Sequence, residues 1–147
     1  MHQWHAIGIF CEDVRDEKQS HSLIGVMSDN VNVPAIPGMF PKLGIYVRIN
    51  VSPSADIGPI SLKLHNPNGT QLQLAGFDAD FVKKTQQEAA DKGSPWAGFM
   101  ITGIASPFPI EAPGIVLLVA TLAGEEVVCA VLNVQLIPSA TASVPPA

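Results

Sequence analysis

The last third of the chain constrains the fold most strongly, because it holds two long apolar runs separated by a short turn. The first run covers residues 115–122, Gly124-Glu125 follows, and the second run covers residues 127–137. Two such runs joined by a short glycine-containing turn predict an antiparallel hairpin. Alternate residues of the second run share one face, which we expect to lie in the core: Ala130, Leu132, Val134 and Leu136.

Similar patterns predict strands along most of the remaining chain. The clearest alternation covers residues 42–52, where Leu43, Ile45, Val47, Ile49 and Val51 share one face. A second hairpin is predicted across the turn Asn66-Pro67-Asn68-Gly69, between strands at residues 60–65 and 71–75. Further strands are expected at residues 6–12, 22–28 and 98–105, whereas the proline-rich residues 34–41 are unsuited to a central strand.

One helix is predicted, over residues 78–92. Asp78 or Asp80 can cap its start and Gly93 can close its end. Its apolar stripe is thin, which is typical of a surface helix, and consists of Phe81, Val82, Thr85 and Ala89. Together these elements predict a mainly β fold. We expect an antiparallel β-sandwich of seven or eight strands, immunoglobulin-like in general architecture, with one short helical insertion.

Length and composition favour a single domain with an apolar surplus. We expect one sandwich domain over residues 1–137, followed by a disordered tail of Pro, Ala, Ser and Thr over residues 138–147. The chain is 47% hydrophobic and 14% charged, against about 25% charged residues in a typical soluble domain. This surplus predicts either a well-covered core or a surface for a partner, and a second copy of the chain is the simplest partner.

Charge and hydropathy argue against nucleic-acid and membrane partners. The net charge is −5, and the eight basic residues are scattered instead of forming a stripe. Apolar runs are interrupted before they reach the roughly 20 residues of a membrane span, and the first residues do not resemble a signal peptide. We therefore expect a cytoplasmic protein, in which Cys11 and Cys129 are free thiols within strands.

The densest polar segment follows the first predicted strand. It contains six of the chain's 21 charged residues (13 acidic plus 8 basic), namely Glu12, Asp13, Arg15, Asp16, Glu17 and Lys18. Such a cluster can recognise a basic partner or hold a hard cation, and Cys11 and His21 nearby make a transition-metal site conceivable. The alternative is a solvated turn whose charges neutralise one another. The missing Gly and Asn of a calcium loop favour that alternative.

Motifs for catalysis are missing from the sequence. It contains no Gly-x-Ser-x-Gly, no phosphate-binding glycine loop and no His-Glu-x-x-His or Cys-x-x-Cys. A cysteine inside an apolar strand, such as Cys11, has a raised pKa and is a poor nucleophile. We therefore expect neither enzymatic activity nor a cofactor, and we assign no catalytic, cofactor-binding or metal-ligating residue.

The first 45 residues resemble a bacterial family described only as a domain of unknown function. The resemblance lies in Ile9-Phe10-Cys11-Glu12-Asp13-Val14-Arg15, Ser22-Leu23-Ile24-Gly25-Val26 and Pro41-Lys42-Leu43. Glu12 stands where the family usually has Asp. The resemblance implies a bacterial or phage origin and a β-rich domain but no activity, and it makes Asp13 and Arg15 the first residues to mutate.

Two functional hypotheses follow from these observations. The first is a non-enzymatic β-sandwich that acts through protein–protein contact or self-assembly in a bacterial or phage context. The second is a small-ligand or metal-binding protein that uses the region from Cys11 to His21.

Overall fold

The computed structural model describes residues 3–137, and these form eleven strands and one helix. The predicted tail, residues 138–147, lies outside the described residues. The helix is α1 (Ala79–Asp91). The strands are β1 (Trp4–Asp16), β2 (His21–Val26), β3 (Asn30–Val33), β4 (Gly38–Phe40), β5 (Leu43–Val51), β6 (Ile60–His65), β7 (Gln71–Phe77), β8 (Ala97–Ala105), β9 (Phe108–Ile110), β10 (Gly114–Leu122) and β11 (Glu125–Leu136).

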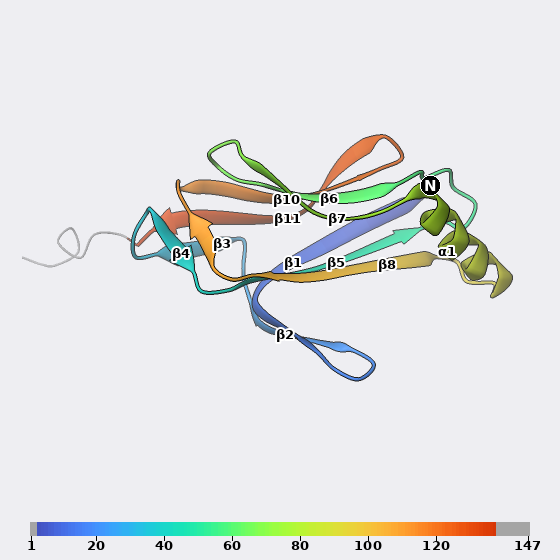
Figure 1. The fold of residues 1–147 in the computed structure, drawn as a ribbon, viewed down its shortest axis with the longest axis horizontal. Coiled ribbons are helices and arrows are strands. Elements are labelled where there is room, and N and C mark those ends of the chain that lie inside the picture. The colour runs from blue at the N-terminus through green and yellow to red at the C-terminus, as the bar shows by residue number, and fades with distance from the viewer. Residues whose placement is uncertain (1–2, 138–147) are drawn as a thin grey trace, which may run out of the picture.

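The strands form a sandwich of two sheets. One has four strands in the order β2-β1-β5-β8, and the other has five in the order β3-β11-β10-β6-β7. Figure 1 shows the two layers one above the other, with α1 at one end and β4 at the other. The predicted mainly β sandwich is therefore confirmed. The described strands outnumber the seven or eight expected, and β3 pairs with β11 in parallel instead of antiparallel.

The three strands that were not predicted are short: β4 and β9 include or adjoin prolines, and β3 ends directly before Pro34. β3 has only four residues and sits at a sheet edge, where its missing outer partner costs little. β4 and β9 pair only with each other and bring Phe40 and Phe108 together, with their rings stacked at 6.4 Å. Such short pairings depend on contacts between distant segments, so local sequence patterns do not reveal them.

The predicted core face of β5 is confirmed. Its alternate residues are at most 7% exposed: Leu43, Ile45, Val47, Ile49 and Val51. On β11, Leu132 and Val134 are fully buried, but Ala130 is only partly buried and Leu136 is 50% exposed. Leu136 is the last residue of its strand, so the alternation continues past the part of β11 that the other sheet covers.

The first hairpin differs from the prediction. Instead of ending near Glu12, β1 continues to Asp16, and β2 pairs with it from Cys11↔Val26 to Asp16↔His21. This far part of the hairpin projects from the sandwich (Figure 1). A strand in solvent needs no apolar face, so a charged sequence can extend it.

Helix α1 closes one end of the sandwich. The Asp78 carboxylate accepts a hydrogen bond from the Phe81 N–H at 2.8 Å, which confirms the predicted N-cap. Val82 and Ala89 are buried, as is Gln86, whose amide donates to the carbonyls of Ser52 and Ala55 at 2.9 and 2.8 Å. A buried glutamine therefore ties the helix to the loop that follows β5.

We expect Gln86→Leu to lower the free energy of unfolding by about 1–3 kcal/mol, because the Ala55 carbonyl loses its buried hydrogen bond and the Ser52 carbonyl keeps only the Ala55 N–H as a donor. Urea unfolding of the full chain measures the loss. Gln87→Leu is the matched control: Gln87 is exposed and bonds only to Asp91, so its change should stay within about 0.5 kcal/mol. Equal losses for the two variants would contradict this role of Gln86.

Candidate functional site

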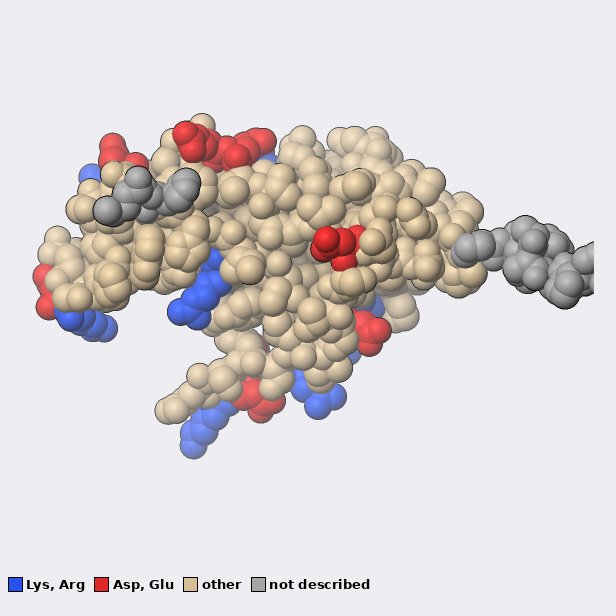
Figure 2. Space-filling view, turned by 180° about the vertical axis from the view of Figure 1, so that it is seen from behind, with Lys and Arg blue, Asp and Glu red and all other residues tan. Residues whose placement is uncertain are grey.

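The charged cluster from Glu12 to Lys18 lies on the projecting β1–β2 hairpin. Glu12, Asp13, Arg15 and Asp16 belong to β1, and Glu17 and Lys18 follow it in the turn. Figure 2 shows charged side chains of both signs on this projection. The cluster therefore stands in solvent, away from the space between the two sheets.

Opposite charges in the cluster face one another at moderate distances. Asp13 lies 3.8 Å from Arg15 and 3.8 Å from Lys42, and Arg15 is 66% exposed. Asp16 lies 3.0 Å from the His21 ring. Exposed pairs of this kind contribute about 0–1 kcal/mol each. Lys42 was absent from the predicted cluster, because only the fold brings the start of β5 beside β1.

The hypothesis of a ligand or metal site in the region from Cys11 to His21 stays a prediction, and Glu17 to His21 line an open cavity of about 790 Å³ there. Cys11 pairs with Val26 at the base of the hairpin ladder, whereas His21 pairs with Asp16 at its far end. Within residues 3–137, no group of three His, Cys, Asp or Glu side chains is placed to hold a metal ion. The two residues therefore do not converge on one ligand.

Both cysteines are free, as predicted, but they differ in burial. Cys11 of β1 is fully buried beside Gly44 of β5, with which it pairs. A Cβ on Gly44 would come within 2.9 Å of the Cys11 sulfur. Cys129 is only partly buried. Burial raises the pKa of both thiols above the ordinary value. At Cys11 two smaller effects of Asp13 act on the pKa in opposite directions: a hydrogen bond with its backbone lowers the pKa, and the negative charge of its carboxylate raises it. Both thiols are therefore poor nucleophiles.

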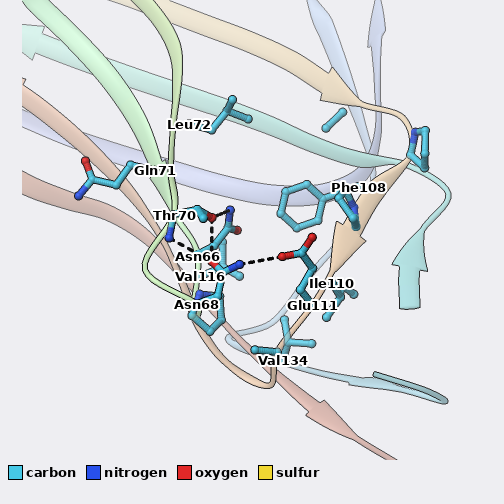
Figure 3. A pocket seen from close by; sticks show the side chains of 15 residues that line it. Asn66, Asn68, Thr70, Gln71, Leu72, Phe108, Ile110, Glu111, Val116 and Val134 are labelled. Atoms are coloured by element: carbon cyan, nitrogen blue, oxygen red, sulfur yellow. Dashed lines mark hydrogen bonds between the residues drawn. The ribbon is translucent and has the colours of Figure 1, made fainter. Parts of the chain in front are cut away.

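A cavity of about 340 Å³ lies at the end of the sandwich that carries β9. Its floor is apolar, with Phe108, Val116 and Val134, and its rim is polar (Figure 3). The rim groups bond to one another: Asn68 donates to Glu111 at 2.8 Å, and Thr70 donates to Asn68 at 2.7 Å. These bonds hold the β6–β7 turn against the β9–β10 connection, so we interpret the rim as structural.

The sandwich has a second opening along one side, between the edge strands β7 and β8. A mostly apolar cleft of about 280 Å³ lies there, lined by Leu72, Leu74, Ile104 and Phe108 among others. Leu72 is 48% exposed and Ile104 is 44% exposed. Neither β7 nor β8 contains a charged residue or a proline. This side therefore combines apolar side chains with two sheet edges.

A model of a family of unknown function, DUF6941, matches residues 6–135. The chain belongs to DUF6941. The matched segment runs from β1 into β11, so it includes both sheets, the charged hairpin and the β7–β8 opening. The resemblance to a domain of unknown function is thereby confirmed. A comparison with curated proteins and with solved structures gives no significant match.

A second apolar surface of this DUF6941 member lies on the opposite side, between β1 and β11. Ile7 and Val26 are each 59% exposed there, and Val128 is 49% exposed. Figure 2 shows a broad area without charged side chains on the face it presents. β1 and β11 pack closely on this side, because a Cβ on Gly8 would meet Cys129 and Ala130 of β11 within 3.3 Å.

The described part of the chain contains no helix that could span a membrane. Its helix, α1, has thirteen residues, and none of residues 3–137 forms a helix of the length and apolar character that a bilayer crossing requires.

We expect the double change Asp13→Ala with Arg15→Ala to lower the free energy of unfolding by less than about 1 kcal/mol, because Arg15 is 66% exposed and lies 3.8 Å from the partly buried Asp13 carboxylate. Thermal melts of the double variant and of the unchanged chain measure this. A loss of several kcal/mol would mean that the pair is a structural element of the hairpin.

We expect both thiols to react slowly with a maleimide at neutral pH, with Cys129 ahead of Cys11. A raised pKa leaves little thiolate, so the labelling rate should keep rising with pH beyond the range where a free thiol is already ionised. Mass spectrometry of labelled peptides measures each site, and urea-unfolded chain is the control. Rapid labelling of Cys11 in the native state would contradict its burial.

Proposed function

We propose that this protein is a non-enzymatic interaction module, which contacts another polypeptide through the edge of strand β8. The observation that carries this proposal is that β8 is a long, regular sheet edge without a protecting feature. It pairs with β5 over nine consecutive residues, from Val51↔Ala97 to Leu43↔Ala105, without a bulge. Its other edge has no strand partner among the described residues. Such an edge is a template for adding a strand.

The other sheet edges carry features that oppose strand addition. β3 has four residues, and β2 has six, with Gly25 at a φ of +66°. β7 is interrupted where its register with β6 shifts between Leu62 and Lys63. β3 pairs only with residues 133–136 of β11, and the part of β11 that it leaves unpaired begins with Glu125 and Glu126. Short length, irregular backbone and charge are the usual protections of an edge strand. β8 has none of these features: it is nine residues long, pairs without a bulge and contains no charged residue.

The cleft beside β8 supports the same proposal. An added strand would direct every second side chain toward the opening between the sheets, where Leu72, Leu74 and Phe108 offer an apolar surface. Backbone hydrogen bonds would then supply affinity and the cleft would select side chains, as in known strand-addition complexes.

We further propose a cytoplasmic location and a bacterial or phage assembly as the setting. The two free thiols favour a reducing compartment, and the low content of charged residues favours a surface that is covered in the assembled state.

Site-specific photo-crosslinking in the producing cells tests the contact. A photoreactive side chain replaces Thr102, in the middle of β8, and the covalent adducts are identified by mass spectrometry. The matched control is Thr121, which has similar intermediate exposure but lies on β10, between two partner strands. We expect adducts with another polypeptide chain from position 102 and few from position 121. No adduct from position 102, or equal yields from the two positions, would overturn the proposal.

A further inference from the structure

We infer that the partner of β8 is β8 of a second copy, paired antiparallel about Ile101 across a two-fold axis. This inference rests on the proposed contact through β8 and names its partner. Two sheets of four strands would join into one continuous sheet of eight (4 + 4), with β8 and its copy at the centre. The inference follows from which backbone groups are free, how the side chains fit, and where the charges lie.

The free backbone groups of β8 belong to the residues that face outward. On β1, the core-facing residue Phe10 accepts a hydrogen bond from Met27, on the β2 side. β8 runs in the same direction as β1, since both are antiparallel to β5. Core-facing residues of β8 therefore direct their backbone groups toward β5, and the alternate residues direct theirs toward the open edge. Those residues are Gly98, Met100, Thr102 and Ile104.

Pairing about Ile101 places all nine residues of β8 opposite residues of the copy. Met100 then faces Thr102 of the copy and Gly98 faces Ile104, so the residues with free backbone groups meet one another, as hydrogen-bonded pairs require. On the core side, Phe99 faces Gly103 and Ile101 faces itself. Each glycine thus lies opposite a large side chain, an arrangement that covers the glycine and stabilises cross-strand pairs.

Charge favours a second copy at this edge and at few others. Each chain has a net charge of −5, so two copies repel wherever acidic surfaces meet. β8 itself contains no charged residue. The tip of the β1–β2 hairpin, which carries charges of both signs, borders a cavity on the outer face of the sheet that also includes Met100 of β8. Helix α1 lies at the end of the sandwich, where Gln86 bonds to the loop after β5 and the Phe81 ring lies 6.3 Å from the Phe99 ring of β8. Self-pairing of β8 therefore joins two acidic chains along a strand that carries no charge of its own.

Light scattering behind a sizing column, on the purified full chain over a range of concentrations, measures the assembly. We expect the mass of two chains. Thr102→Pro removes an N–H that points to the open edge and leaves the bonds to β5 intact, so it should raise the dimer dissociation constant by more than about tenfold. Thr102→Val keeps that N–H and should dimerise like the unchanged chain. Far-UV circular dichroism checks that both variants fold.

Two charge variants test the register and do not depend on tolerance of proline. Met100→Lys with Thr102→Lys places like charges directly opposite each other across the two-fold axis, and should give monomers. Met100→Lys with Thr102→Glu places a lysine opposite a glutamate, and should restore the dimer. Both variants alter positions on the outer face of β8, where Met100 is exposed and Thr102 is partly exposed. Equal dimer dissociation constants for the two charge variants and the unchanged chain would overturn pairing about Ile101.

The outcomes separate this inference from the proposed function. A monomer at every concentration, with position 102 crosslinked in cells to a different protein, overturns self-pairing and leaves the strand-addition proposal standing. The absence of any adduct at position 102 overturns both. An adduct between two copies at position 102, together with the predicted order of the variants, supports the β8 dimer.

Discussion

Strand β5 holds the structure together through its backbone and its side chains at once. It pairs with β1 on one side and with β8 on the other, so both edges of its backbone are engaged. Its five core-facing residues, Leu43 to Val51, are nearly or fully buried against the opposing sheet. Burying an aliphatic side chain contributes about 1.5–3 kcal/mol. Without this strand the four-stranded sheet would fall into two separate parts and the core would lose one wall.

Because β5 is central, its two neighbours β1 and β8 each have a second edge, and these two edges differ in how many of their backbone hydrogen-bonding groups find a partner. β1 is covered by β2 along part of its length and packs against β11 along the rest. β8 has β5 on one side and the open edge on the other. A sandwich must end its sheets somewhere, and most ends here are short, bulged or charged. The interaction we propose uses the edge of β8, which is neither short, bulged nor charged, and the same backbone hydrogen bonding that builds the sheet would extend it.

Much of the architecture could be predicted from local patterns. The alternation in residues 42–52, the Asn66–Gly69 turn and the Asp78 cap each correspond to an element of the structure. The failures share a cause. The charged end of β1 forms a strand because β2 pairs with it in solvent, and β4 forms because β9 comes to it across the proline-rich connections. Gln86 is buried because the loop after β5 supplies two carbonyls. Each depends on a partner distant in the sequence.

The candidate site shows the same division. The cluster of residues 12–18 was visible in the sequence, and the structure places it in solvent with Lys42 beside it. The β8 edge was missed, because residues 97–105 have the same apolar composition whether a strand is central or at an edge. The sequence by itself determined which segments are strands and which faces are apolar, since alternation and turn residues act over a few positions. Only the tertiary structure decided which strand lacks a neighbour, because sheet order depends on which distant segments pair.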